Sequence, residues 1–319
     1  MTHKIILDTD PGIDDAMAIF TAFAHPEVEL LGLTTTFGNV SVEQATINAL
    51  QLVEMAGVDV PVAKGVETPW VKSLSDFPDF VHGKDGFGNI NLPAPKGAPI
   101  AQSAAEFIVD QVMSQPGEVT LVAVGPLGNL AAALKLQPQI VDKVKQVVIM
   151  GGVIAADGNV SPVAEANILS DPHAADKVMA ASWEVVIVGL DVTHQVVLSN
   201  ALFNQIRDEN PKVGAFMHQA AQFYISFYSS IRDIDGCYGH DVSAVAYVIA
   251  PDIFTVESGE VCVATDGVAI GQTIMSRFGI PYPLPFWQER PKQKACMGVD
   301  DQRLVALFRD AMTSDFWSK

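Results

Sequence analysis

The segment LDTDPGIDDA, residues 7–16, holds four aspartates within eight positions, directly after a short apolar run: Asp8, Asp10, Asp14 and Asp15. A helix start explains part of this pattern, with Asp10 as the cap, Pro11 in the first turn and acidic groups at the positive end of the helix dipole. It does not explain why four mutually repelling carboxylates gather at one strand end. A divalent cation does, because it turns the repulsion into coordination. The nearby ligands are all hard oxygens, so the expected ion is Ca²⁺ or Mg²⁺ and not zinc.

The bulk composition describes a chain that can fold around one large core. It has 319 residues, of which 49% are hydrophobic and 18% are charged, and it contains no linker-like tract or internal repeat. The formal net charge is −18. A nucleic-acid binder needs a cationic face that displaces counterions from phosphates, and an anionic membrane surface makes the same demand. We therefore expect neither partner.

The cysteines and the apolar runs indicate a cellular compartment. Cys237, Cys262 and Cys296 are odd in number and widely separated, which is typical of reduced thiols in an intracellular protein. No apolar run approaches the ~20 residues of a membrane span. The first strand-like run leads straight into the aspartates, so we expect no cleaved leader there. The predicted location is the cytoplasm.

Short β-branched runs alternate with amphipathic stretches over the first two thirds of the chain. The runs are continuously apolar, as expected for parallel strands covered on both faces. We predict an α/β fold: an open, mostly parallel sheet flanked by helices, forming a single domain over residues 1–319 with a more helical C-terminal third. Expected strands are 4–7, 30–36, 119–124, 146–150 and 185–190, and expected helices lie near 14–24, 41–56, 101–115, 127–136, 171–182, 199–230, 241–250 and 300–312, with a hairpin at 260–270.

Polar residues follow each of the five predicted strands. Gly38-Asn39 follows the second strand, Gly125 to Asn129 the third, Gly151-Gly152 the fourth and Asp191 the fifth. Turns also favour these residue types. In open parallel sheets, however, ligands bind beyond the carboxyl ends of the strands. The five strand ends therefore predict one common site.

The sequence resembles the nucleoside hydrolases of the inosine-uridine preferring type, which cleave the N-ribosidic bond of nucleosides. The resemblance begins with DTDPGIDDA and extends over nearly the whole chain. The further motifs, in the family's order, are GNVSVEQ (38–44), HGKDGFG (82–88), GPLGNLA (125–131), IMGG (149–152), GNVSPVAEAN (158–167) and GHD (239–241).

The resemblance implies a calcium site and a water nucleophile. Its ligands would be Asp10, Asp15, Asp241 and the backbone carbonyl of Gly128, where the family usually has Thr. A carbonyl ligand tolerates that change, but glycine loosens the loop. Water beside the ion loses a proton more readily, and Asp10 is the expected general base. Bond cleavage builds positive charge on the ribose, which an acidic pocket favours.

The resemblance also assigns residues to the substrate. The ribose hydroxyls would be bound by Asp14, Asn39, Asn159, Glu165 and Asn167, with Met150 nearby, while Asp8 would support the site from behind. Each lone Asn is also an ordinary turn residue. His240 would protonate the leaving base, although a lone His is often structural. His82 lies in a Gly-rich loop that is expected to close over the site and to contact the base.

The base end of the predicted pocket is aromatic. Tyr224 and Tyr228 share one helix face, and Arg232 is expected to assist them. An aromatic core stripe would give the same spacing. Purine-specific members place tryptophans around the base, whereas Gly83 follows His82 here. We therefore do not expect strict purine specificity.

Two other classes of protein share part of this pattern. A haloacid-dehalogenase-like phosphatase also carries DxD after its first strand, but it needs a hydroxyl-rich continuation that Pro11-Gly12-Ile13 does not supply. A non-catalytic nucleoside-binding protein could dispense with Asp10 and His240, which this chain retains. The hydrolase would act in ribonucleoside catabolism and in purine and pyrimidine salvage. Its expected partners are a ribonucleoside and further copies of the chain, as a dimer or tetramer.

Overall fold

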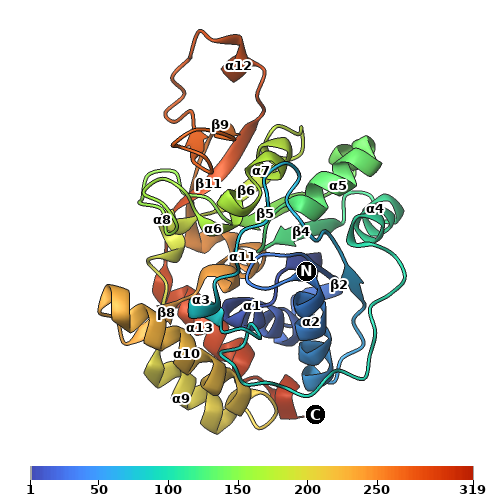
Figure 1. The fold of residues 1–319 in the computed structure, drawn as a ribbon, viewed down its shortest axis with the longest axis vertical. Coiled ribbons are helices and arrows are strands. Elements are labelled where there is room, and N and C mark those ends of the chain that lie inside the picture. The colour runs from blue at the N-terminus through green and yellow to red at the C-terminus, as the bar shows by residue number, and fades with distance from the viewer. Residues whose placement is uncertain (1, 319) are drawn as a thin grey trace.

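The computed structural model describes residues 2–318, and a nine-stranded sheet lies at its centre (Figure 1). The strand order is β10-β9-β11-β6-β5-β4-β1-β2-β3. The bounds are β1 (His3–Thr9), β2 (Val28–Thr35), β3 (Val62–Lys64), β4 (Val119–Ala123), β5 (Gln146–Met150), β6 (Val185–Val188), β9 (Phe254–Val263), β10 (Thr273–Met275) and β11 (Lys292–Val299). A separate antiparallel pair joins β7 (Val197–Ser199) to β8 (Gly236–Tyr238).

Strand direction within the sheet brings the important loops to one edge. All pairings from β3 across to β6, and that of β6 with β11, are parallel. The antiparallel pairings in the described part of the sheet are the two that β9 makes, with β11 and with β10. The chain builds outward from β1 through β2 to β3 and then returns to add β4, β5 and β6 on the other side of β1. Its order therefore reverses at β1, where a crevice forms at the carboxyl ends of the strands.

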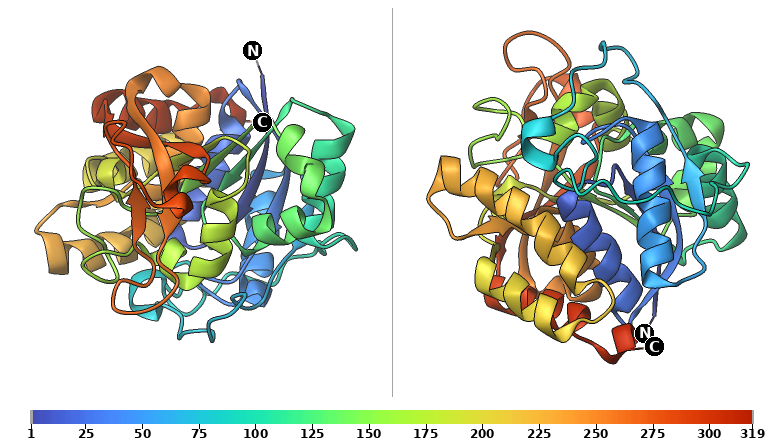
Figure 2. Two further views of the ribbon diagram at one scale, coloured as in Figure 1. Left: turned by 90° about the horizontal axis from the view of Figure 1, so that it is seen from above. Right: turned by 60° about the horizontal axis from the view of Figure 1, so that its bottom comes forward.

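Helices cover both faces of the sheet (Figure 2). Their bounds are α1 (Ile13–Ala24), α2 (Val42–Ala56), α3 (Asp79–His82), α4 (Ala104–Ser114), α5 (Gly128–Leu136), α6 (Ala166–Ser170), α7 (Pro172–Met179), α8 (Leu190–Thr193), α9 (Asn200–Glu209), α10 (Gly214–Arg232), α11 (His240–Ile249), α12 (Pro285–Gln288) and α13 (Asp301–Met312). Three short 3₁₀ turns occupy Pro138–Asp142, Pro251–Ile253 and Asp315–Ser318. None of the helices among residues 2–318 is both long and apolar enough to cross a membrane.

The alternation of side chains along β1 divides the core in two. Ile5 and Leu7 face the layer that contains α1, α2, α10, α11 and α13. Ile6 faces the opposite layer, which contains α4, α5 and α7. Both faces of this strand are buried, which explains its continuously apolar sequence. The polar residues that follow the strand are thereby held at the edge of a rigid sheet.

The start of α1 differs from the sequence-based prediction. The helix begins at Ile13 with Gly12 as its cap, and Asp15 reaches back to accept the Gly12 N–H at 2.9 Å. Asp10 therefore does not cap the helix. It lies in the loop before the helix, where its carboxylate is free for another role.

The predicted fold class is confirmed, with local differences. The expected helix at 199–230 is two helices, α9 and α10, and the expected hairpin is formed by β9 and β10 around a longer turn. The sequence analysis did not predict β3, β7, β8 or β11. The first three have only three residues each, and β11 begins with three polar residues, Lys292 to Lys294, so none of them shows the apolar run that marked the other strands.

Candidate active site

A cavity of about 210 Å³ opens at the carboxyl edge of the sheet. Its walls come from segments that are far apart in the sequence: the start of α1, the loop after β2, residues 158–167, α10 and the start of α11. The predicted residues that line it are Asp14, Asn39, His82, Met150, Asn159, Glu165, Asn167, Tyr224, Tyr228, Arg232, His240 and Asp241. The ends of β1, β2, β4 and β5 thus contribute Asp14, Asn39, Val124 and Met150 to one cavity, whereas Asp191, after β6, does not line it. Its carboxylate accepts the N–H groups of residues 154–156 and fixes that loop.

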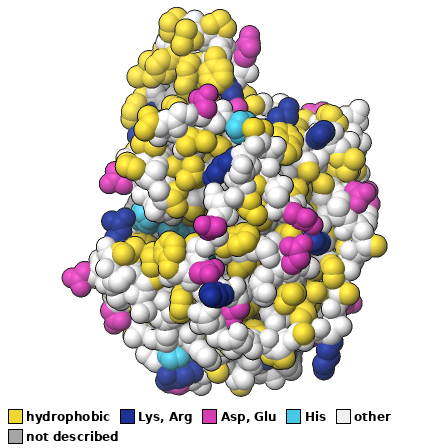
Figure 3. Space-filling view, in the orientation of Figure 1, with side chains coloured by type: hydrophobic (Ala, Val, Ile, Leu, Met, Phe, Trp, Pro, Cys, Tyr) yellow, Lys and Arg dark blue, Asp and Glu magenta, His cyan; other side chains and the backbone are white. Residues whose placement is uncertain are grey.

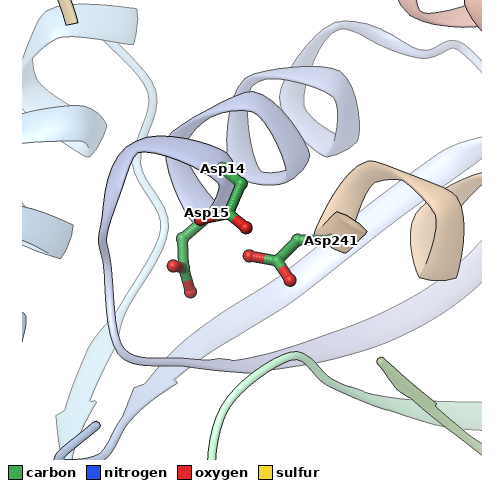
Figure 4. A group of neighbouring side chains, drawn as sticks. All are labelled: Asp14, Asp15 and Asp241. Carbon is green, nitrogen blue, oxygen red and sulfur yellow. The ribbon is translucent and has the colours of Figure 1, made fainter. Parts of the chain in front are cut away.

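Three buried carboxylates converge beside the cavity, and the buried residue Asp10 lies next to them. Asp14, Asp15 and Asp241 place carboxylate oxygens within 4.8 Å of one another, from the N-termini of α1 and α11 (Figure 4). Asp10 joins them through its own N–H, which donates to Asp15 Oδ1 at 3.2 Å. Asp14 and Asp241 line the cavity, whereas Asp10 and Asp15 are fully buried.

Burial sets the protonation energetics of this cluster. It raises the pKa of Asp14 to about 6 and holds the pKa of Asp10 well above its usual range, with the charge of Asp15 adding to the effect. The pKa of Asp241 is also raised well above its usual value by burial and by the other aspartates, and that of Asp15 is raised by burial and by Asp14. Each shift has the same cause: desolvated like charges favour the neutral acid unless a cation compensates them.

The carboxylate of Asp10 is held by a close backbone. Its Oδ2 accepts the N–H of Asn39 at 2.6 Å, while its Oδ1 is buried and has no hydrogen-bond partner. A Cβ atom at Gly38 would lie 2.0 Å from Oδ2, and one at Gly125 would lie 2.3 Å from Oδ1. Glycine at the ends of β2 and β4 is therefore what lets two loops approach this carboxylate.

Asp8, the remaining aspartate of the opening segment, faces another environment. Its Oδ1 accepts hydrogen bonds from Thr34 and from the side chain of Asn129, and burial raises its pKa to about 7. Asn129 in turn donates to the carbonyl of Thr35 and accepts from the N–H of Val66. Asp8 thus ties β1 to β2 and to α5 behind the site, without joining the carboxylate cluster.

A chain of hydrogen bonds leads from the acidic floor up one wall. Tyr224 donates to Asp14 Oδ2 at 3.0 Å, and its hydroxyl lies 3.3 Å from that of Tyr228. Tyr228 is 2.8 Å from Nε2 of His240, whose Nδ1 is 2.8 Å from the Thr193 hydroxyl. Thr193 was not predicted, because no local pattern marks a hydroxyl that lies 47 positions from its partner.

The histidine in this chain is neutral. Burial, with His194 and His82 nearby, holds the pKa of His240 well below its usual range, so the ring carries one proton. That proton lies either on Nε2, toward Tyr228, or on Nδ1, toward Thr193, and the two contacts of 2.8 Å allow both forms. In either form both ring nitrogens of His240 have a hydrogen-bond partner.

His82 is also neutral and oriented. Its Nδ1 accepts the N–H of Ile13 at 3.2 Å, and burial lowers its pKa to about 4 although Asp15 opposes the shift. A backbone N–H can only donate, so the ring proton of His82 lies on Nε2. The imidazole lies 5.3 Å from the Tyr224 ring. This side chain can thus offer one donor to whatever fills the cavity.

The segment 158–167 supplies the opposite wall. Both oxygens of Glu165 accept backbone N–H groups, from Gly152, Asn167 and Ile168, so this carboxylate is fixed while lining the cavity. The Asn167 side chain donates to the carbonyls of Val124 and Met150, at 2.8 and 3.1 Å. Asn159 accepts the N–H of Ala166. Asn159, Glu165 and Asn167 therefore both hydrogen-bond the backbone of their own loops and line the cavity.

Gly128, the predicted carbonyl ligand, does not line the cavity. It is the first residue of α5, and a Cβ there would meet Val66. A carbonyl at this position points along the helix axis, toward the N–H four residues on. Val124, at the end of β4, is the residue of this segment that lines the cavity. The structure therefore does not support the Gly128 carbonyl as a ligand.

The mouth of the cavity is apolar, a feature that the sequence analysis found only in part. Phe80 and Ile231 are more than half exposed there, and the Phe80 and Phe227 rings lie 5.9 Å apart. Phe227 lies three positions after Tyr224 on α10, a spacing that could have indicated the mouth, whereas Phe80, on α3 two residues before His82, gave no signal in the sequence.

Comparison with known proteins identifies the family. The model of the inosine-uridine preferring nucleoside hydrolase family matches residues 5–306. The chain belongs to that family. Among its relatives, a probable uridine nucleosidase 2 from Arabidopsis thaliana is 42% identical over 97% of both chains, and an inosine-uridine preferring nucleoside hydrolase from Leishmania major is 44% identical over 98% of both. A solved plant nucleoside hydrolase superposes with a TM-score of 0.94 at 38% identity, over 98% of this chain and 100% of that one.

Membership defines the chemistry at a coarse level. Nucleoside hydrolases are N-glycosidases that act on ribonucleosides, and this chain is an enzyme of that class. The acidic floor and the apolar mouth agree with a substrate that has a polyhydroxylated sugar at one end and a flat base at the other. The family is metal-dependent, and the cluster of Asp14, Asp15 and Asp241 could hold a metal ion.

Proposed function

We propose that this nucleoside hydrolase cleaves inosine and uridine to ribose and free base in a calcium-dependent reaction, with Asp10 as the general base. The observation that carries the proposal is the cluster of three buried carboxylates, Asp14, Asp15 and Asp241, with oxygens within 4.8 Å of one another. The buried carboxylate of Asp10 lies close enough for the charge of Asp15 to raise its pKa. Names of relatives support both substrates, since they include uridine nucleosidases and an inosine-uridine preferring hydrolase.

The donor set fits a calcium ion. Asp10 Oδ1 and Asp14 Oδ1 are buried without hydrogen-bond partners, an arrangement that costs free energy unless a cation or a polar ligand satisfies them. All donors in the group are oxygens, as calcium prefers. We assign the ion to Asp10, Asp15, Asp241 and the carbonyl of Val124, which replaces Gly128. When bound, the ion compensates the carboxylate charges and makes a neighbouring water more acidic.

Asp10 is the best-placed base for that water. Its Oδ2 is occupied by the Asn39 N–H, so only Oδ1 is available to take a proton. Burial raises the pKa of Asp10, which increases its basicity once it is ionised. As the bond to the base breaks, positive charge develops on the ribose, and Asp14 and Asp241 face it from the cavity floor.

The ribose would be oriented by groups from both walls. The residues that line the cavity and that we assign to the ribose are Asp14, Asn39, Asn159, Glu165 and Asn167, with Met150 in the same lining. Several of these side chains are fixed by backbone hydrogen bonds, so the cavity is largely preformed. A preformed site reduces the entropy lost when the substrate is positioned.

The leaving base is met by the donors of the other wall. Negative charge develops on the base as the bond breaks, and Tyr228 and His240, which line the cavity and lie 2.8 Å apart, are the residues that we assign to donate to it. His82 offers a second donor through its own Nε2. Phe80, Phe227 and Ile231 supply apolar surface for a ring of either size. These groups favour a broad choice of base over strict purine specificity.

The cytoplasm remains the proposed location, because all three cysteines are free and buried. The proposed role is ribonucleoside catabolism and salvage of purines and pyrimidines.

The direct test is a reducing-sugar assay with inosine and with uridine. We expect equimolar ribose and base from both, loss of activity after the protein is stripped with a chelator, and recovery when calcium is returned. Magnesium added alone serves as the matched control for ion identity. Full activity in a verified metal-free preparation would contradict calcium dependence, and failure on every ribonucleoside would contradict the substrate assignment.

A further inference from the structure

Asn48 is a buried polar residue in the middle of a helix. It lies on α2 among mostly apolar buried neighbours, and its exposed fraction is 0%. Asparagine is a poor helix former, and a buried amide costs free energy unless its polar groups find hydrogen-bond partners. The proposed reaction gives no role to this side chain. Its presence at this position therefore depends on what its amide contacts.

The amide of Asn48 has a partner for each of its polar groups. Its Nδ2 donates to the carbonyl of Pro11 and to the carbonyl of Asp85, each at 2.8 Å. Its Oδ1 accepts a hydrogen bond from Nε2 of Gln44 at 2.8 Å. A backbone carbonyl can only accept, so the NH₂ side of the amide must face Pro11 and Asp85. One side chain thus joins two segments that are far apart in the sequence.

The first of these segments is the Asp10 loop, residues 10–12, which connects β1 to α1. Pro11 directly follows Asp10, and the first turn of α1 carries Asp14 and Asp15. The helix α2 lies beside α1 (Figure 1). Asn48 therefore holds the loop of the proposed general base against the neighbouring helix.

The second segment is the His82 loop, residues 82–91, which is braced from within. The Asp85 carboxylate accepts three N–H groups of this loop at 2.8 to 2.9 Å, those of Phe87, Asn89 and Asn91. The N–H of Gly88 donates to the carbonyl of His82 at 2.8 Å. His82 lines the active-site cavity, and histidine side chains are visible at a hollow of the face shown in Figure 3. Because the loop is internally bonded, a shift of Asp85 would move His82 with it.

The two loops also touch each other around Asn48. Nδ1 of His82 accepts the N–H of Ile13 at 3.2 Å, just after the Asp10 loop. A Cβ atom at Gly86 would lie 2.6 Å from Nδ2 of Asn48 and 2.8 Å from the carbonyl oxygen of Pro11. Gly86 has a φ of +83°, so glycine permits both the backbone conformation and this close approach. The amide of Asn48 lies at the centre of the contact between the loops.

We propose that Asn48 is a positioning residue of the active site, which holds the His82 loop against the Asp10 loop so that calcium binding at the carboxylates also orders His82. This inference rests on the proposed calcium site. A bound ion restrains Asp10, and the next residue along the chain, Pro11, shares that restraint. Asn48 bonds the Pro11 carbonyl and the Asp85 carbonyl with one NH₂ group, so order in one loop is transmitted to the other through contiguous hydrogen bonds.

Two matched substitutions on α2 separate this role from general stability. Asn48→Asp keeps the shape of the side chain but replaces the donating NH₂ group by an oxygen that faces two carbonyl oxygens. Gln51→Glu is the control, because Gln51 lies on the same helix, is 8% exposed and donates to the carbonyl of Pro93 at 2.8 Å. Pro93 does not line the cavity. Both substitutions remove an amide donor from a backbone carbonyl, but only Asn48→Asp acts between the two loops.

Hydrogen–deuterium exchange read by mass spectrometry reports the order of each loop separately. In wild type and in Gln51→Glu, saturating calcium should slow amide exchange in residues 83–91 on the order of tenfold, although none of these residues is a proposed ligand. In Asn48→Asp, at a calcium concentration that titration shows to be saturating, this slowing should be lost while residues 13–16 remain protected. Asn48→Asp should also lower kcat/KM for inosine on the order of 10²-fold, whereas Gln51→Glu should stay within a few-fold of wild type.

The proposal is overturned if calcium slows exchange in residues 83–91 of Asn48→Asp as much as in wild type, or if Gln51→Glu loses the effect equally. Asn48→Ser, which keeps one donor, takes the place of Asn48→Asp if thermal melts show that the aspartate variant is unfolded, and it should lose part of the protection. Full protection in Asn48→Ser would then overturn the proposal.

A failure of the proposed calcium site can be told apart from a failure of this inference. If calorimetry shows that wild type binds no calcium, the proposed function fails, and Asn48 is then judged in the metal-free protein. There, Asn48→Asp should speed exchange in residues 9–16 and 83–91 together, relative to wild type and Gln51→Glu. Unchanged exchange in both segments would show that Asn48 does not hold the two loops together.

Discussion

Replacing Asp10 with Asn tests the assignment of the general base most directly. The backbone N–H of Asn39 points at Oδ2 of Asp10, so the new side-chain amide must turn its oxygen toward that N–H. Its NH₂ group then takes the place of Oδ1, the one oxygen without a partner. The substitution therefore keeps the shape of the side chain while exchanging an acceptor for a donor where the proton has to go.

The expected loss follows from the role of a single general base. Such a group contributes about 10²–10⁴ in rate, so kcat should fall on the order of 10³-fold, or about 4 kcal/mol of transition-state stabilisation. The assay is release of ribose from inosine, at a calcium concentration shown by titration to saturate each variant. Asp8→Asn is the matched control, because Asp8 is equally buried but bonds only Thr34 and Asn129. It should keep kcat within about tenfold of wild type. If Asp10→Asn kept kcat within a few-fold of wild type, another group would have to accept the proton and the reasoning would fail.

Three further predictions concern the carboxylate cluster and the donor wall. In the folded, metal-free protein the pKa of Asp14 is raised from its ordinary 3.8 to about 6. Protonated Asp14 therefore adds to the free energy of unfolding below about pH 4, and this contribution is lost as the pH rises through about 6. Calcium requires the ionised carboxylates, so it should raise the melting temperature more at about pH 8 than at about pH 5, and an increment independent of pH would contradict this. His240→Ala should lower kcat for inosine by about 10²–10³-fold. The loss for uridine should be at least about tenfold smaller than the loss for inosine, because a purine nitrogen accepts a proton more readily. A nitrophenyl riboside, whose leaving group is already activated, should be cleaved by the variant almost as fast as by wild type. Equal losses on all three substrates would show that His240 acts by orienting Asp241. Thr193→Val removes the hydroxyl that contacts His240 Nδ1 and should lower kcat about tenfold or more with little change in KM, whereas Thr193→Ser should restore it; equal behaviour of the two variants would show that this contact does not position His240.

The sequence alone determined the features that depend on neighbours along the chain. Buried parallel strands such as β1, β4 and β5 need apolar residues on both faces, so their runs are visible without any partner. The aspartates of the opening segment are close in sequence, and their mutual repulsion indicated a cation before any fold was known. Glycine and asparagine after successive strands indicated one edge, since parallel strands end on the same side.

The tertiary structure decided what depends on approach between distant segments. Only the packed loops show that Val124, and not Gly128, reaches the cavity, because the carbonyl direction depends on where α5 begins. The contact of Thr193 with His240 joins the end of β6 to α11, and no periodicity encodes such a pair. The sequence did not predict β11, because its buried residue Gln293 is polar. In the structure, where β11 pairs with β6, Gln293 hydrogen-bonds the backbone of β6 and of the end of α7. Local patterns report which side chains prefer burial, whereas the protonation state of a buried group and the partner of a lone hydroxyl are set by what folding brings within hydrogen-bond distance.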